Sequence, residues 1–290
     1  MRKLNKKHKG IDFNDMFLLR KNLDDENVAS SLDDKNKIAL DIMEDILNEE
    51  KRGDLENFSV LNYIEETNSV MKWMLNSALE AKCMGSDYCE VIDIVSIFLI
   101  KVYRDYEVLP IIIDLIFERN KNNLYIHELV WAFFQGYSVE SLKLICDRLS
   151  SEDIKTKELA CTLLSFIPKV NSYAYGNKEF YAKKWIDNNK DYLYFTDESK
   201  HARSNPVYCK LNLEGKYLGK KVNKKTGEII NFKNNDKEKL KEFSNLDEEL
   251  KLVLASYSLK LKKVSLDKWT RWFNYPLDEQ ISIAKREILI

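Results

Sequence analysis

In the middle of the chain, apolar side chains recur at the 3.6-residue spacing of an α-helix, and this pattern itself repeats about every 30 residues. When the sequence is shifted by about 30 residues, Asp93, Asn123 and Asp153 superimpose, and apolar residues follow each at matching positions. An Asp or Asn there can accept hydrogen bonds from the free amides of a helix start. Short apolar helices are expected before two of them, at 109–117 and 139–149. The sequence therefore predicts helical hairpins that bury their apolar faces by stacking on one another.

Two segments resemble a known family. Residues 109–115 (LPIIIDL) resemble the first helix of a HEAT repeat, in which a proline bends the helix, and residues 153–165 resemble its second helix. The middle unit departs from the pattern, because Asn123 and His127 stand where it has Asp and Arg. The resemblance covers about residues 86–168 and implies an α-solenoid. An irregular helical bundle with evenly spaced helices is the alternative.

Few turn-forming residues interrupt the chain. Gly 8 and Pro 4 make 12 of 290 residues, which argues against a β-sandwich or barrel and against a glycine-cradled nucleotide site. After Pro168, short alternating segments are expected as strands at 192–196, 207–213 and 217–222, with a turn at 223–227 leading to 228–232. The helices expected elsewhere are 33–52, 69–81, 178–188, 236–243, 246–262, 265–273 and 277–288.

The predicted fold is mainly α, with HEAT-like stacked helical hairpins followed by a small β-hairpin element and a C-terminal helical cap. Four parts are expected along the chain. They are an irregular N-terminal arm at 1–30, a helical repeat domain at 31–170, an aromatic and basic segment with short strands at 171–235, and the cap at 236–290.

The net charge of −1 hides two segments of opposite charge. Residues 24–66 hold 14 acidic and 4 basic side chains, a net of −10, and residues 200–225 hold 8 basic side chains against Glu214, a net of +7. Because burying an unpaired charge costs free energy, each segment is expected to face water, the other segment or a partner.

Catalytic motifs are not found in the sequence. The histidines at positions 8, 127 and 201 are far apart, and Cys83 and Cys89 form one close pair where zinc sites usually show two. Residues 215–221 resemble a phosphate-binding loop, but they have one residue too few between the glycines and are expected to be strand. We therefore predict no catalytic residue, metal or cofactor. An enzyme whose site is assembled from distant residues is the alternative.

The sequence also bears on location. It contains no uninterrupted apolar stretch of the ~18 residues that a transmembrane helix needs, and its basic N-terminus is not followed by a signal-peptide core. The five cysteines are odd in number, which is typical of free thiols in a reducing compartment. We predict a cytoplasmic protein with no membrane partner and no identified small-molecule substrate.

The predicted function is a non-catalytic interaction or scaffold module that binds another protein through a short solenoid surface. Its candidate contact residues are Tyr125, Glu128, Lys155 and Glu158 on the second helices, with Trp269 and Trp272 of an aromatic stripe near the C-terminus. The alternative for that stripe is the core of the C-terminal cap.

The alternative function is nucleic-acid binding by the basic segment, in which lysines neutralise phosphates and aromatic rings stack on bases. Its candidate residues are Lys216, Lys220, Lys221, Lys224, Lys225, Tyr208 and Tyr217. A solvated lysine-rich hairpin, or one that docks on the acidic segment of the same chain, would explain the same residues.

Overall fold

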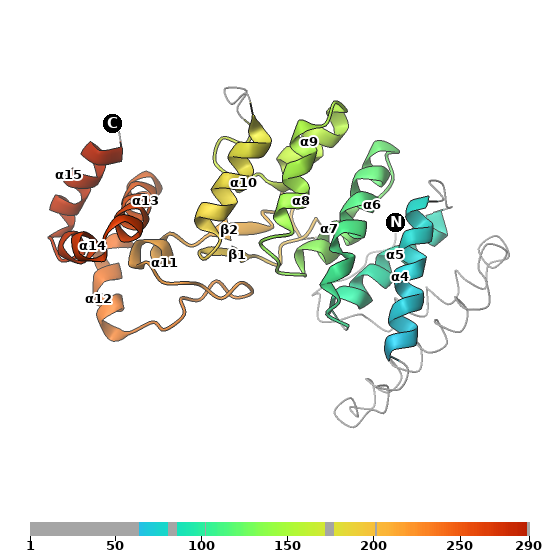
Figure 1. Ribbon diagram of the computed structural model, residues 1–290, viewed down its shortest axis with the longest axis horizontal. Coiled ribbons are helices and arrows are strands. Elements are labelled where there is room, and N and C mark those ends of the chain that lie inside the picture. The colour runs from blue at the N-terminus through green and yellow to red at the C-terminus, as the bar shows by residue number, and fades with distance from the viewer. Residues whose placement is uncertain (1–63, 81–85, 102, 172–176, 201, 289–290) are drawn as a thin grey trace. The chain divides into compact units, whose positions relative to one another are not determined.

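A computed structural model describes residues 64–80, 86–101, 103–171, 177–200 and 202–288 (Figure 1). This part of the chain is mainly helical and contains a small two-stranded antiparallel sheet, so both coarse predictions are confirmed. The expected N-terminal arm, the helix at 33–52 and most of the acidic segment lie outside the described residues.

The chain forms two compact units. Unit 1 holds the described residues up to Thr162 together with those of Asp197–Pro206, and unit 2 holds Leu163–Thr196 and the described residues from Val207 onward. Each unit is described by itself below.

Unit 1 is a helical unit in which α6 has the most helical neighbours. α6 packs against α4, α7 and α8, while α5 packs against α4 and α7. Its elements are α4 (Ile64–Glu80), α5 (Ser86–Lys101), the 3-10 helix η3 (Tyr106–Val108), α6 (Leu109–Lys121), α7 (His127–Phe134), α8 (Leu142–Cys146), the 3-10 helix η4 (Asp147–Ser150) and α9 (Ile154–Leu163).

The core of unit 1 follows from the apolar pattern of these helices. Pro110 lies in the first turn of α6, where its missing amide hydrogen leaves no helical bond unmade. Ile112, Ile113 and Ile116 of the same helix are buried. All side chains of α7 from Leu129 to Phe134 are buried as well, so this helix is apolar on every side rather than amphipathic.

The predicted helix starts are right at only one of three positions. Asp153 precedes α9, and its carboxylate accepts from the backbone amide of Thr156 at 2.8 Å. Asp93 instead lies inside α5 and is buried. Asn123 has a left-handed backbone, with φ of 57°, in the turn before α7 begins at His127. Shared residue types at a 30-residue interval therefore do not mark equivalent positions on these helices.

Asp93 is buried because it forms an ion pair. Its carboxylate lies 2.5 Å from the Arg119 guanidinium, and both side chains are less than a tenth exposed. The same guanidinium donates to the carbonyl of Cys89 at 2.9 Å and to that of Tyr125 at 3.4 Å. One side chain of α6 thus fixes α5 and the turn before α7.

Unit 2 contains the sheet and the C-terminal helices. Strands β1 (Leu193–Phe195) and β2 (Cys209–Leu211) pair antiparallel, with Tyr194 opposite Lys210. α13 packs against α11, α14 and α15 (Figure 1). The helices are α10 (Lys178–Asn189), α11 (Leu213–Leu218), α12 (Asn234–Phe243), α13 (Glu248–Val264), α14 (Leu266–Phe273) and α15 (Leu277–Ile288).

The predicted strand at 217–222 is wrong, because Leu213–Leu218 forms helix α11. The Asn212 side chain accepts from the amide of Gly215 and starts the helix. Gly219 ends it with φ of 63°, a conformation that glycine adopts without steric cost. The turn at 223–227 is confirmed, since the amide of Gly227 donates to the carbonyl of Asn223.

No described helix is long and apolar enough to cross a membrane.

Replacing Arg119 tests the ion pair. Arg119→Met removes the guanidinium from beside a buried carboxylate, so we expect unit 1 to lose about 3–5 kcal/mol of unfolding free energy. Urea titration measures this loss, with amide hydrogen exchange in α5 and α6 as the readout. The double variant Arg119→Met/Asp93→Leu removes both charges and should recover most of it. A loss below about 1 kcal/mol in the single variant would contradict the assignment.

Candidate functional site

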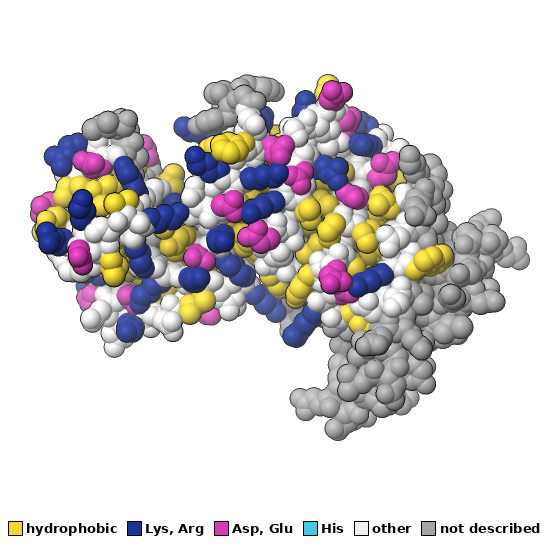
Figure 2. Space-filling model, in the orientation of Figure 1, with side chains coloured by type: hydrophobic (Ala, Val, Ile, Leu, Met, Phe, Trp, Pro, Cys, Tyr) yellow, Lys and Arg dark blue, Asp and Glu magenta, His cyan; other side chains and the backbone are white. Residues whose placement is uncertain are grey.

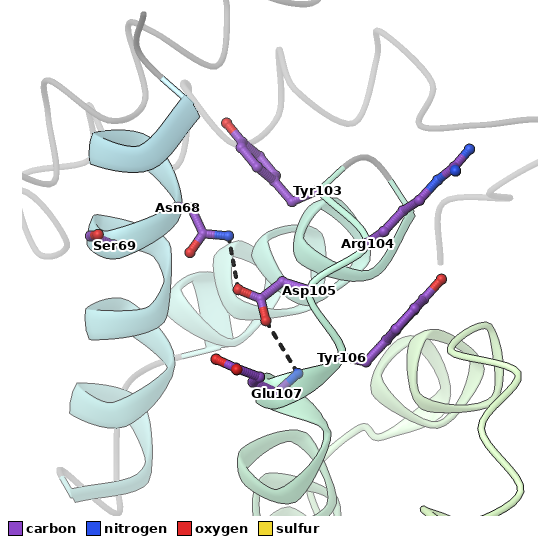
Figure 3. Close-up of a pocket in the computed structure, with 7 residues that line it drawn as sticks. All are labelled: Asn68, Ser69, Tyr103, Arg104, Asp105, Tyr106 and Glu107. Atoms are coloured by element: carbon purple, nitrogen blue, oxygen red, sulfur yellow. Dashed lines mark hydrogen bonds between the residues drawn. The ribbon is translucent and has the colours of Figure 1, made fainter. Parts of the chain in front are cut away.

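An open groove of about 900 Å³ lies on unit 1, between α4 and the segment that joins α5 to α6. Figure 3 shows how its lining residues are arranged. Asp105 points toward Asn68 of α4, whereas Arg104 and Tyr106 extend side by side away from that helix (Figure 3). The lining is Asn68, Ser69, Tyr103, Arg104, Asp105, Tyr106 and Glu107.

Asp105 anchors the joining segment to α4. Its carboxylate lies 2.6 Å from the Lys72 ammonium and accepts from the Asn68 amide at 2.9 Å. It also accepts from the backbone amide of Glu107 and so caps the start of η3 at Tyr106. Burial opposes ionisation, but the hydrogen bonds from Lys72 and Asn68 hold the pKa of Asp105 below its usual range. The hydrogen bond from Lys72 in turn raises the pKa of that lysine.

Large side chains in and beside the groove are exposed to solvent. Tyr106 is 45% exposed, and Trp73, one turn beyond Ser69 on α4, is 46% exposed. Arg104 is exposed and has a left-handed backbone, with φ of 55°. A non-glycine residue in this conformation carries a free-energy cost that the surrounding structure must offset. The groove therefore presents Arg104 and Tyr106 together on a segment held by Asp105, and Trp73 is exposed nearby on α4.

The four residues predicted on the second helices lie elsewhere on unit 1. Tyr125 is exposed, with its ring 4.5 Å from that of His127. Lys155 of α9 donates to the Asn123 side chain at 2.8 Å. Glu128 is half-buried at the start of α7, and Glu158 is exposed on α9. None of the four lines the groove.

The aromatic stripe of α14 is packed inward. Trp272 is 3% exposed, so its prediction as a surface contact is wrong. It belongs to the core of the C-terminal helices, which was the alternative for this stripe. Trp269 is half-buried, stacks on Phe273 at 4.8 Å and donates to Ser258 at 2.8 Å. Tyr217 stacks on Phe243 at 4.3 Å in the same cluster.

The basic segment does not present its lysines as one stripe. Lys220 pairs with Asp236 at 2.5 Å, and Lys224 donates to the carbonyls of Lys190 and Leu193. Lys221 lies 3.3 Å from Asp191. On the face in view, Lys and Arg are interspersed with Asp and Glu (Figure 2).

Three further candidates of the nucleic-acid hypothesis are buried in unit 2. Lys216 is 5% exposed, and burial lowers its pKa to about 8. Burial also raises the pKa of Tyr208 and of Tyr217 to about 12. These rings cannot stack on bases without opening the unit. Lys225, at the tip of the turn, is exposed.

Sequence reasoning missed the groove. Trp73 lies within the helix predicted at 69–81, and residues 103–107 carry no motif. The available signal was Asp105, which stands two residues before Glu107 in a short break between two apolar helices.

A group of metal-ligating side chains is not found among the residues that the structure describes. No family model, curated protein or solved structure matches the chain.

The groove depends on the charge of Asp105. Asp105→Asn should lower the stability of unit 1 by about 1 kcal/mol at pH 7. Because the folded pKa lies below the ordinary value of 3.8, this contribution is complete above 3.8 and is lost as the pH falls through the folded pKa. Urea midpoints of both proteins from pH 7 to pH 2 should converge at the acid end. A difference that stays constant with pH would contradict the account.

Proposed function

We propose that the protein is an interaction module that binds a partner protein through the groove of unit 1. The observation that carries the proposal is the exposure of Arg104 and Tyr106, which line one concave site, with Trp73 exposed on α4 one turn from the lining residue Ser69. Trp, Tyr and Arg supply most of the binding energy at protein interfaces, where they cluster near the centre of the contact.

The groove is also preorganised. Asp105 binds two side chains of α4, and the Arg119–Asp93 pair fixes the two helices that the joining segment connects. A surface that is already ordered loses less conformational entropy when a partner binds. The left-handed backbone of Arg104 fits such a role, because strain of this kind collects at binding sites.

The charges of the groove favour a partner that offers a carboxylate. Lys72 lies within ion-pair distance of both Asp105 and Glu107, so its charge is compensated. Arg104 has no described carboxylate within ion-pair distance. A guanidinium binds carboxylates through two parallel hydrogen bonds, so we expect an Asp or Glu of the partner to lie at Arg104 and an apolar side chain to lie at the neighbouring Tyr106.

We further propose that α4–α9 are stacked hairpins of the HEAT-like type. The pairs of packed helices support it: α4 with α6 and α6 with α8 would form one layer, and α5 with α7 the other. A two-layer stack of this kind provides an extended surface for a partner.

The nucleic-acid hypothesis has less support. Lys216, Tyr208 and Tyr217 are buried, and Lys220 and Lys224 are bonded within unit 2. Lys221 and Lys225 are the two exposed members of the set, too few for the phosphate contacts that make binding strongly salt-dependent.

Groove variants test the proposal. A partner is captured from the native lysate, identified and purified, and its affinity for the full chain is measured by calorimetry. Arg104→Glu and Tyr106→Ala should each weaken binding at least tenfold, which corresponds to about 1.4 kcal/mol.

Tyr275→Ala is the matched control, because this tyrosine has a similar exposure, 40%, on unit 2. Its affinity should equal that of the unchanged protein. Equal affinities for all variants, or a loss confined to Tyr275→Ala, would refute the proposal, and a loss confined to Lys221→Glu/Lys225→Glu would favour the basic segment.

A further inference from the structure

The lysines around α11 differ in the group that lies beside each ammonium. Lys220 lies 2.5 Å from the Asp236 carboxylate. Lys262 donates to the carbonyl of Gly219 at 2.6 Å, at the C-terminal end of α11, and lies over the Trp269 ring. A cation at a helix C-terminus is favourable, because that end carries partial negative charge. Each of these two ammonium groups thus contacts an oxygen that carries full or partial negative charge.

Lys216 lacks such a partner. Its ammonium is buried, and among the described residues its hydrogen bond goes to the neutral hydroxyl of Ser256, at 3.2 Å, with no ion pair to a carboxylate. A buried charge without a counter-ion is costly, so the neutral amine is favoured. Burial, together with the charge of Lys263, lowers the pKa of Lys216 to about 8. The neutral amine can then accept a proton close to neutral pH.

Ser256 lies on α13 in front of this amine. It is half-buried, so it is more accessible than Lys216. Ser258, two positions further along α13, has a hydroxyl that is used in structural hydrogen bonds. Ser258 is fully buried, donates to the carbonyl of Tyr217 at 2.6 Å and accepts from Trp269. Ser256 is the serine whose hydroxyl contacts a base.

We propose that Ser256 and Lys216 form a nucleophile–base pair that reacts with small activated acyl or phosphonyl compounds. With an ester, the Ser256 oxygen attacks the carbonyl carbon while its proton passes to Lys216 Nζ. The bond to the leaving alkoxide then breaks, and the alkoxide takes that proton. Water hydrolyses the acyl-serine by the same route, with Lys216 again accepting and returning the proton.

The position of Ser256 sets the expected rate. Its own amide lies within α13, where helix amides are used in hydrogen bonds and cannot bind the oxyanion. Lys263 is the nearby cation; it donates to Asn188 at 3.1 Å. We therefore expect slow turnover, and a covalent adduct is the informative readout.

The test uses a fluorophosphonate, in which the serine oxygen replaces fluoride on phosphorus. The folded full chain should be labelled once, at Ser256 as mapped by mass spectrometry, with a rate that rises with pH around 8. Ser256→Ala should remove the label. Lys216→Met and Lys216→Arg should each slow it at least tenfold, because neither side chain can act as the base.

Lys251→Met is the matched control, since Lys251 is also on α13 and pairs with Glu248; its labelling should be unchanged. Circular dichroism shows whether each variant is folded. Labelling at another residue, an adduct on Lys216 itself, no labelling of the unchanged protein, or a folded Lys216→Arg variant labelled at the full rate would each overturn the proposal.

Discussion

The buried pair between Asp93 and Arg119 is the interaction on which the geometry of unit 1 depends. It joins α5 to α6, and the hydrogen bonds from the same guanidinium to Cys89 and Tyr125 hold the start of α5 and the turn before α7. The segment that carries Arg104 and Tyr106 connects these two helices. Asp105 then fixes its middle to α4. Side-chain bonds to α4 thus hold the wall of the groove in place.

In both units, charged side chains differ in whether a described group of opposite charge or dipole lies beside them. Asp93, Arg119, Lys220 and Lys262 have partners that match their charge or dipole, and each links two elements. Arg104 and Lys216 do not meet a described carboxylate. Arg104 is exposed at a groove and Lys216 is buried beside a hydroxyl, and on this ground we propose a binding role for the first and an acid–base role for the second.

Helices with a strong apolar period were predictable from sequence, and those with a competing local signal were not. Residues 178–188, 265–273 and 277–288 form helices at the expected places, since Asn177 and Ser265 cap the first two and the last two are strongly amphipathic. Tyr217–Val222 alternates like a strand, but the Asn212 cap and Gly219 favour a short helix. The burial of Lys216 was not predictable, because lysine is rarely buried and its contact with Ser256 joins residues 40 positions apart. Trp73 was missed for the converse reason, since a tryptophan at helical spacing is usually a core residue.

Hydrogen exchange of the full chain, alone and with a protein captured as its partner, tests the proposed binding site most directly. The account predicts added protection in the described amides of α4 and of residues 103–108, with those of residues 207–225 unchanged. Protection confined to residues 207–225, or distributed evenly over both units, would contradict it.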